Sequence, residues 1–365
     1  MKIGIIGLPN SGKTTVFNAL TRSEKPAAAF TSGQVAVHTA VVDVPDPRVD
    51  TLSAMFRPEK TTYATVTFND VSGFGTGKGA SDIGGALLNA IASNDALMLV
   101  VRAFEDENVL HPADRVDAAR DMEMVEGELI LNDMTVIDKR LERLANPKKQ
   151  GSGDEEKRSA QVAELLSRLM EALEAETPLR DVDLSEAERR LIAGYGFLSL
   201  KPLLRVVNCS DLQGSAGDPV GSVGEADCAG FEDDVLCISG KLEAEIAQME
   251  PEDSAAFLAE YGIAEPGLNR AIRLSYRMTG LETMFTVGED EVRAWSIRAG
   301  SKAVEAAGAI HTDLQRGFIR AETVSYDDLV ACGSLAEARK QGKLRLEGKE
   351  YIVQDGDVLS IRYNV

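Results

Sequence analysis

The segment Gly7–Thr14 constrains the fold more than any other part of the chain. It reads GLPNSGKT and fits the pattern GxxxxGK[ST], in which main-chain N–H groups wrap around a phosphate. The apolar run Lys2–Ile6 precedes it, and a helical pattern with Val16 and Leu20 on one face follows. A strand, a glycine-rich turn and a helix in this order open an α/β unit, so the sequence predicts a phosphate-binding loop.

Each residue type in this motif has a physical role beside a phosphate. Gly7 and Gly12 permit the backbone conformations in which successive N–H groups face the anion. The ammonium of Lys13 reaches the β- and γ-phosphates, and the hydroxyl of Thr14 binds Mg²⁺. The following helix points the positive end of its dipole at the anion. We therefore expect the nucleotide to contact Asn10, Ser11, Gly12, Lys13, Thr14 and Thr15.

Strand-like runs continue the α/β pattern along the chain. Several of them are apolar without alternation, which is typical of parallel strands covered by helices on both faces. These runs are Val37–Val42, Ala64–Phe68, Ala96–Val101, Leu203–Val207 and Val235–Ile238. The order of strands and helices predicts a doubly wound α/β sheet of the P-loop NTPase class.

A long segment without strand signals interrupts this series. Between residues 113 and 199, apolar residues recur at helical spacing on both sides of the polar stretch NPKKQGSGDEEK. We interpret it as an inserted antiparallel helical hairpin whose apolar stripes bury each other; an arm that also offers a partner surface stays open. Short strand-like runs begin near residue 281. The predicted domains are a split P-loop G domain (1–112 and 200–280), the hairpin (113–199) and a C-terminal module (281–365).

Composition limits the classes of partner. The 365 residues include 39 Lys plus Arg against 59 Asp plus Glu, a net charge of −20, which argues against sequence-independent binding of DNA. No apolar run approaches the roughly 20 residues that cross a bilayer. Four cysteines without CxxC spacing and three scattered histidines predict neither a disulfide framework nor a zinc site. We expect a cytoplasmic protein with reduced thiols and no membrane partner.

Two further motifs lie just past predicted strands. The residues from Asp70 to Gly73 read DVSG; the carboxylate can hold Mg²⁺ through water, and the N–H of Gly73 can reach the γ-phosphate. Asn208 and Asp211 have the NxxD spacing of a base-reading element, in which the Asp211 carboxylate accepts the two donors of a guanine edge. An Asx turn at the strand end is the alternative for this pair.

With these residues in place, the chain resembles the YchF subfamily of Obg-related P-loop NTPases. The matching stretches include GLPNSGKTT, VPDPRVDTL, LMLVVRAFED, ELILNDMTVIDKRLERL and KPLLRVVNCSD. The stretch LETMFTVGEDEVRAWSIRAGSKAVEAAGAIHTDLQRGFIRAE resembles the joint into, and the body of, a TGS domain, which is a small β-grasp module. The resemblance covers nearly the whole chain and implies a G domain with an inserted helical hairpin, followed by TGS.

The resemblance also implies an activity and a partner. The subfamily implies nucleotide hydrolysis, slow in isolation, coupled through the hairpin and the TGS domain to the ribosome or another translation component. Its members often prefer ATP and carry Glu at the last position of NxxE. This chain has Asp211 there, which favours GTP, but Cys209 stands where GTPases usually have Lys, which weakens one wall of a guanine pocket. We place ATP slightly ahead, with Asn208, Cys209 and Asp211 at the base.

The predicted catalytic residues follow from a departure after the DVSG motif. That segment reads GFGTGKGAS, longer than the usual GLVKGAS of the subfamily, and Phe74 occupies the position of the water-orienting Gln of Ras-like enzymes. An apolar ring cannot orient water. In related enzymes an Asn at the position of Asn10 helps hold K⁺ near the transferring phosphates, where added positive charge stabilises the transition state. The resemblance therefore implies Lys13, Asn10 and Gly73 as catalytic residues.

The predicted Mg²⁺ site takes its protein ligands from Thr14, Asp70 and Thr31. Thr31 lies in FTSGQVAV, the first switch, and is the best candidate there for a second hydroxyl ligand. Two other functions stay open. One is a nucleotide-stabilised binding scaffold with negligible turnover, motivated by Phe74 and the longer switch loop. The other is an RNA-binding module with a vestigial G domain.

Overall fold

The computed structural model describes residues 1–22, 37–71, 85–145, 154–209, 235–260 and 265–364. The chain divides into two compact units, an N-terminal unit of Met1–Ala40 and Thr67–Ala271 and a C-terminal unit of Val41–Val66 and Ile272–Val365. Residues 41–66, which the predicted G domain includes, thus group with the C-terminal residues.

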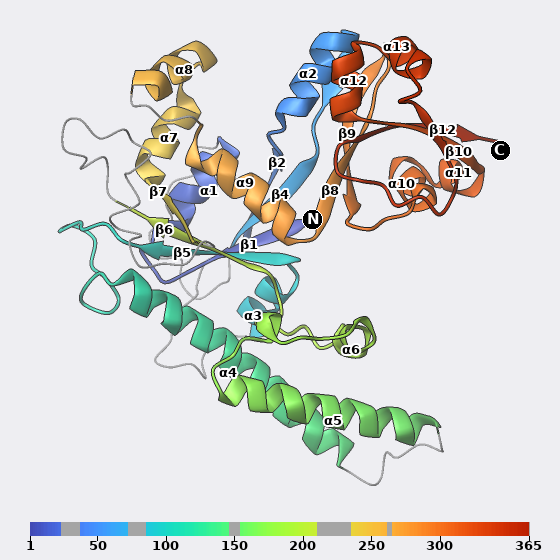
Figure 1. The fold of residues 1–365 in the computed structure, drawn as a ribbon. Helices are drawn as coiled ribbons and strands as arrows, with labels where there is room; N and C mark the ends of the chain where they lie inside the picture. The colour runs from blue at the N-terminus through green and yellow to red at the C-terminus, as the bar shows by residue number, and fades with distance from the viewer. Residues whose placement is uncertain (23–36, 72–84, 146–153, 210–234, 261–264, 365) are drawn as a thin grey trace. The chain divides into compact units, whose positions relative to one another are not determined.

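A six-stranded sheet with the order β2-β4-β1-β5-β6-β7 forms the centre of the N-terminal unit (Figure 1). The strand pairs β4–β1, β1–β5, β5–β6 and β6–β7 are parallel. The predicted doubly wound α/β class is confirmed, because helices separate these parallel strands along the chain. The strands are β1 (Lys2–Ile6), β2 (Val37–Asp43), β4 (Thr65–Val71), β5 (Ala96–Arg102), β6 (Leu203–Asn208) and β7 (Val235–Ile238).

The helices of this part of the chain follow the strands as the sequence pattern predicts. The central strand β5, ALMLVVR, is buried at every position, as expected for a strand covered on both faces. Helices α1 and α7 pack against each other. The helix bounds are α1 (Lys13–Thr21), α3 (Gly85–Ala92), α6 (Glu186–Ile192), α7 (Gly240–Gln248), α8 (Pro251–Glu260) and α9 (Gly267–Met278).

The sheet register brings distant polar residues to one edge. Ile5 of β1 pairs with Asp70 of β4, and Arg102 of β5 pairs with Asn208 of β6. Because the strands are parallel, their carboxyl ends meet at the same edge, which is where ligands bind in open α/β sheets. The loop of the GLPNSGKT motif begins at this edge, directly after β1.

Two long helices, α4 (Ala118–Leu144) and α5 (Asp154–Glu174), lie side by side and form the predicted hairpin (Figure 1). Their facing stripes share one hydrophobic cluster, to which α4 contributes Ile130 and Ile137 and α5 contributes Leu166 and Leu169. The first turns of α4 differ from the expectation that the stripes only bury each other. Their apolar side chains pack instead into the core formed by β5 and β6, so α4 anchors the hairpin to the sheet. These side chains are Met122, Val125 and Leu129.

A buried carboxylate fixes the return of the chain from the hairpin. Asp133 of α4 is fully buried, and one of its oxygens accepts hydrogen bonds from the N–H of Leu198 at 2.8 Å and from Asn132 at 3.0 Å. The other oxygen accepts from the N–H and the hydroxyl of Ser199, both at 2.7 Å. Burial raises the pKa of Asp133, and these hydrogen bonds oppose the rise. Asp133 therefore ties α4 to the segment that re-enters the sheet at β6.

Replacing Asp133 with alanine is expected to lower the free energy of unfolding by about 3 kcal/mol, because the buried N–H groups of Leu198 and Ser199 lose their acceptors. Urea unfolding monitored by circular dichroism measures this loss. The matched control is Asp138→Ala on the exposed side of the same helix, which should stay within about 0.5 kcal/mol of the original protein. Equal effects of the two substitutions would contradict the role assigned to Asp133.

The C-terminal unit contains a second six-stranded sheet, ordered β11-β10-β12-β8-β9-β3. The pairs β8–β9, β10–β11 and β10–β12 are antiparallel, and β12–β8 and β3–β9 are parallel. Helix α10 (Ala303–Ile310) covers one face through Ala303, Ala306 and Ala307. The strands are β3 (Lys60–Thr62), β8 (Leu281–Thr286), β9 (Glu291–Arg298), β10 (Phe318–Ser325), β11 (Arg345–Glu347) and β12 (Asp357–Tyr363). This mixed sheet with a covering helix is the arrangement expected for the predicted C-terminal β-grasp module.

The segment between β2 and β4 belongs to this second sheet, which the sequence analysis did not predict. Lys60 and Thr62 of β3 pair with Glu291 and Arg293 of β9. Arg48 forms ion pairs with Asp46 at 2.8 Å and with Asp355 at 2.7 Å. Arg48 lies near the start of α2 (Pro47–Phe56); the remaining helices are α11 (Thr312–Arg316), α12 (Tyr326–Cys332) and α13 (Leu335–Lys340).

Two sequence-based expectations about the environment of the chain can be compared with the structure. None of the helices in the described ranges is long and apolar enough to span a membrane. Cys209 and Cys332 form no disulfide, but Cys237 of β7 is disulfide-bonded, so the expectation of reduced thiols does not hold for Cys237.

Candidate functional site

The loop after β1 adopts the backbone that its glycines were expected to permit. Gly7 has φ 148°, Asn10 has φ 64° and Gly12 has φ 92°, all in the region that side chains disfavour. A Cβ atom at Gly7 would lie 2.2 Å from the carbonyl oxygen of Val100, and one at Gly12 would lie 2.1 Å from Nδ2 of Asn208. The loop thus packs directly against β5 and β6, with no room for a side chain at either glycine.

Lys13 opens helix α1 and folds back over the loop. Its Nζ donates to the carbonyl oxygens of Gly7 at 2.9 Å and Leu8 at 2.7 Å. Burial lowers the pKa of Lys13 to about 8, although the negative charge of Asp70 acts in the opposite direction. Among the described residues, the ammonium therefore has two neutral carbonyl acceptors and one nearby carboxylate, an arrangement that favours the arrival of a further anion.

Thr14 and Asp70 meet at the carboxyl ends of β1 and β4. The hydroxyl of Thr14 donates to Oδ2 of Asp70 at 3.1 Å, and Asp70 is fully buried. Within the described residues, Oδ1 of Asp70 and the hydroxyl of Ser11 are buried and have no hydrogen-bond partner. A buried carboxylate oxygen without a partner is costly, so its place next to Thr14 fits a site completed by a ligand.

The donor set at this place fits Mg²⁺. No group of three or more His, Cys, Asp or Glu side chains that could hold a metal occurs among the residues that the structure describes. Mg²⁺ does not need such a group, because it keeps several waters and is bound in nucleotide sites by one or two protein oxygens plus phosphates. The Thr14 hydroxyl and the unpartnered oxygen of Asp70 supply oxygens of that kind.

Asn208 holds the loop in place through both ends of its amide. Its Nδ2 donates to the carbonyl oxygen of Ser11 at 3.1 Å, and its Oδ1 accepts from the N–H of Gly240 at 2.9 Å. Asn208 is buried, and Cys209 beside it is also buried. With both amide groups bonded inside the protein, Asn208 is placed to support the phosphate loop, whereas the sequence analysis expected it to contact the base.

The structure thus brings six of the predicted residues together at one edge of the sheet: Ser11, Gly12, Lys13, Thr14, Asp70 and Asn208. Asn10 lies on the same loop with its side chain exposed, and Thr15 follows in the first turn of α1. Thr31, Gly73, Phe74 and Asp211 lie outside the described residues.

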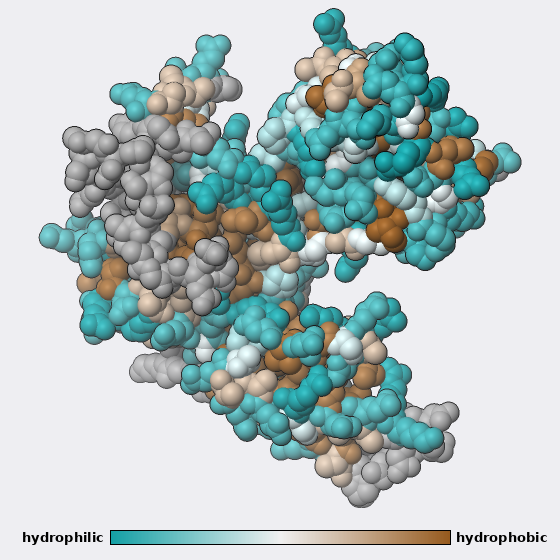
Figure 2. Space-filling view, in the orientation of Figure 1, coloured by the Kyte–Doolittle hydropathy of each residue, from teal (hydrophilic) through white to brown (hydrophobic). Residues whose placement is uncertain are grey.

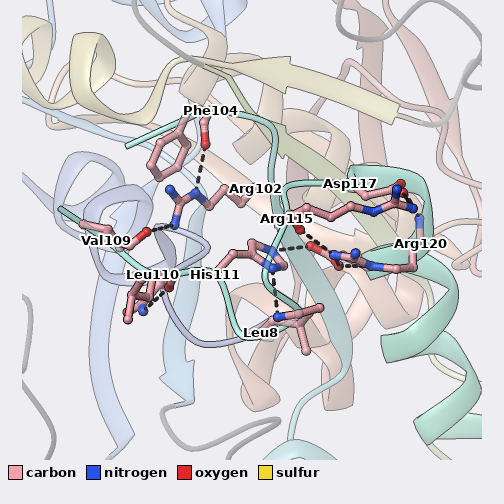
Figure 3. A network of polar contacts seen from close by, with 12 residues as sticks. Leu8, Arg102, Phe104, Val109, Leu110, His111, Arg115, Asp117 and Arg120 are labelled. Atoms are coloured by element: carbon pink, nitrogen blue, oxygen red, sulfur yellow. Dashed lines mark hydrogen bonds and ion pairs between the residues drawn. The ribbon is translucent and has the colours of Figure 1, made fainter. Parts of the chain in front are cut away.

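Sequence reasoning missed a polar network beside the loop, in the connection from β5 to α4 (Figure 3). Nδ2 of Asn10 donates to the carbonyl oxygen of Leu110 at 3.0 Å, and Arg102 binds carbonyls of the same connection. His111 lies 2.8 Å from Asp121 through its Nε2. The available signal was Arg102 itself, because an arginine at the end of a wholly apolar strand must find buried partners.

Comparison with known proteins places the chain among relatives of similar length. A family model described as 50S ribosome-binding GTPase matches residues 2–137, and a model for the C-terminal part of YchF GTPases, described as a protein of unknown function, matches residues 281–364. The "Ribosome-binding ATPase YchF" of Bacillus subtilis (strain 168) is 43% identical over 368 residues, covering 99% of both chains. That of Escherichia coli O157:H7 is 38% identical over 366 residues, covering 100% of this chain and 99% of the relative.

A solved structure shows the same fold over the whole chain. The structure of the Schizosaccharomyces pombe YchF GTPase has a TM-score of 0.83 to this chain and 31% sequence identity. The match covers 99% of this chain and 97% of the other. The similarity therefore extends through both compact units.

Proposed function

The chain belongs to the YchF family, and from this premise we propose that it is a cytoplasmic, Mg²⁺-dependent P-loop NTPase that binds the ribosome and prefers ATP to GTP. The observation that carries the proposal is the arrangement of Lys13, Thr14 and Asp70 at the carboxyl ends of β1 and β4, where buried polar atoms have no partner among the described residues. A magnesium-bound triphosphate supplies the charges and acceptors that these groups lack. The names of the relatives support hydrolysis and ribosome binding.

The residues of the site have different roles in nucleotide binding and hydrolysis. The loop between Gly7 and Thr14 offers its N–H groups to the phosphates, and Lys13 donates to the β- and γ-phosphates in place of its present carbonyl acceptors. Thr14 and Asp70 hold Mg²⁺, which when bound supplies positive charge to the phosphate oxygens. Hydrolysis then needs stabilisation of the charge that develops on the transferring phosphoryl group.

Asn10 is proposed to help hold K⁺ beside the negative charge that develops on the transferring phosphoryl group. Its Nδ2 is engaged by the carbonyl of Leu110, and no described residue donates to its Oδ1. That oxygen remains available to a cation beside the phosphates. Turnover measured over a K⁺ titration, with Na⁺ as the control, is expected to rise with K⁺; a flat titration would remove K⁺ from the proposal.

A direct test compares single-turnover hydrolysis of ATP by the original protein and by Lys13→Ala, with Mg²⁺ and K⁺ present. The proposal is supported if the original protein hydrolyses ATP and Lys13→Ala does not. Equal inertness of the two proteins, with nucleotide still bound by the original, favours the alternative of a nucleotide-stabilised scaffold.

The preference for ATP rests on the position after Asn208. Cys209 is buried and stands where GTPases usually have the lysine that forms one wall of a guanine pocket. Calorimetric titration with ATP and with GTP, repeated on Asp211→Asn, tests the preference. Tighter binding of ATP is expected; a GTP preference that disappears in the variant would show that Asp211 reads guanine.

The hairpin and the C-terminal module are proposed as the surfaces that contact the ribosome. Figure 2 shows apolar patches among the hydrophilic side chains over α4 and α5. Met124 and Leu131, one heptad apart on α4, are 42% and 48% exposed, which is high for large apolar side chains. Co-sedimentation with ribosomes in different nucleotide states tests the partner. Binding that ignores the nucleotide would favour the alternative of an RNA-binding module.

The lowered pKa of Lys13 predicts how nucleotide affinity depends on pH. The charged ammonium is the form that binds phosphate, and in the free protein it loses its proton around pH 8. The affinity for Mg-ATP is therefore expected to fall about tenfold between pH 7 and pH 9. Titration with a fluorescent ATP analogue at both pH values measures the fall. Lys13→Ala should bind the nucleotide weakly at both pH values. An affinity of the original protein that does not change between pH 7 and pH 9 would contradict the role of the Lys13 proton.

A further inference from the structure

Arg102 is a buried arginine whose guanidinium donates hydrogen bonds to main-chain carbonyls. It ends strand β5 and is 2% exposed. Its Nε donates to the carbonyl oxygen of Phe104 at 2.9 Å, Nη1 to that of Val109 at 2.9 Å, and Nη2 to that of Asp106 at 3.4 Å. Its Cζ lies 4.5 Å from the centre of the Phe104 ring. In the described part of the chain no carboxylate forms an ion pair with Arg102.

These contacts determine the path of the connection between β5 and α4. The three carbonyls come from a segment that has no helix or strand of its own. The hydrogen bonds from the guanidinium therefore hold a stretch of backbone that no secondary structure fixes. The end of the connection is fixed separately, because Nε2 of His111 lies 2.8 Å from Oδ2 of Asp121 in the first turn of α4. Figure 3 shows Arg102, Val109, Leu110 and His111 of this connection, with Leu110 close to Val109.

Leu110 links this connection to the phosphate loop. Its carbonyl oxygen accepts from Nδ2 of Asn10 at 3.0 Å, while its side chain is 84% exposed. The contact therefore depends on where the main chain lies. Arg102 holds the carbonyl of Val109, the residue immediately before Leu110. Asn10 is itself in the left-handed region with φ 64°, a conformation that the surrounding structure must sustain.

We propose that Arg102 is a positioning residue for catalysis, which holds the Leu110 carbonyl against Asn10 and thereby fixes the Asn10 side chain beside the transferring phosphate. The inference rests on the proposed function and adds a residue to its site. A lysine cannot replace Arg102 in this role, since its single ammonium lacks the planar fork that reaches separated acceptors. The predicted consequence is a coupling between Arg102 and Asn10 in turnover.

A double-mutant cycle on ATP turnover tests this coupling. Arg102→Lys is expected to lower kcat about tenfold and to change KM less than about threefold, because binding through Lys13 and the loop N–H groups remains. Asn10→Gly removes the side chain and tolerates the positive φ. In the Asn10→Gly protein, adding Arg102→Lys should change kcat less than about twofold.

The control is Arg140→Lys in the hairpin. Like Arg102, Arg140 lies over an aromatic ring: its Cζ is 5.5 Å from the centre of the Tyr195 ring, and its Nε donates to the Tyr195 hydroxyl at 3.0 Å. Its kcat should match the original. If thermal scans show that Arg102→Lys does not fold, Phe104→Leu takes its place in the cycle, with an expected loss of about threefold. No loss in kcat, or the same loss with and without Asn10, overturns the inference. Turnover of the original protein no higher than that of Lys13→Ala overturns the proposed function, and the inference with it.

Discussion

Replacing Lys13 with alanine is expected to lower the affinity for Mg-ATP and the rate of its hydrolysis by at least about 100-fold each. The ammonium is the one charged donor that the phosphate loop supplies, and it already lies within 2.9 Å of the loop carbonyls that surround the site. Removing a positioned donor from the developing charge of a transition state costs about two to three orders of magnitude in rate.

Isothermal titration and single-turnover hydrolysis measure the two effects. The matched control is Lys139→Ala, an exposed lysine of the hairpin, which should leave both quantities unchanged. Thermal unfolding should show Lys13→Ala to be folded, because the buried charge of Lys13 has no counter-ion in hydrogen-bond contact within the described ranges. A variant that binds ATP as tightly as the original protein would refute the assigned role.

Gly12→Ala is expected to abolish nucleotide binding and to destabilise the fold by about 3 kcal/mol. The new Cβ would lie 2.1 Å from Nδ2 of Asn208, and φ at Gly12 is 92°. Either the loop moves or Asn208 moves, and the second choice breaks two buried hydrogen bonds, to Ser11 and to Gly240. Both choices disturb the N–H groups that bind phosphate.

The control for this substitution is a glycine with space around it. A Cβ at Gly127, in the middle of α4, would meet no atom within 4 Å. Gly127→Ala should therefore stabilise the protein by about 0.5–1 kcal/mol, as expected for alanine in a helix interior. Urea unfolding and ATP titration of Gly12→Ala and Gly127→Ala measure the changes in stability and in nucleotide binding. Similar behaviour of the two variants would show that crowding at Gly12 does not matter.

The local parts of the fold were predictable from the sequence because they depend on short-range patterns. Apolar runs, several of them without alternation, marked the strands β2, β4, β5, β6 and β7, and the glycine spacing marked the phosphate loop. The DVSG motif placed Asp70 near Thr14, since the carboxyl ends of parallel strands share one edge. Each of these inferences used residues close together in the sequence or a general rule of parallel sheets.

The parts that were missed depend on contacts between distant residues. Strand β3 is only three residues long, KTT, and pairs with β9 more than 200 positions later, so no local pattern could reveal its sheet. The hydrogen bond from Asn208 to the Ser11 carbonyl could not be predicted, because that acceptor is a main-chain group that any residue could present. Arg102 binds three such carbonyls, which leave no trace in the identity of their residues.

The central claim is that the loop from Gly7 to Thr14 grips a triphosphate with main-chain N–H groups, Lys13 and a magnesium-bound Thr14. A crystal structure with Mg²⁺ and a non-hydrolysable ATP analogue tests it most directly. The account predicts the β- and γ-phosphates within hydrogen-bond distance of Lys13 Nζ, with the metal bound by the Thr14 hydroxyl and facing Asp70. A triphosphate bound elsewhere, with Lys13 still donating to the carbonyls of Gly7 and Leu8, would contradict it.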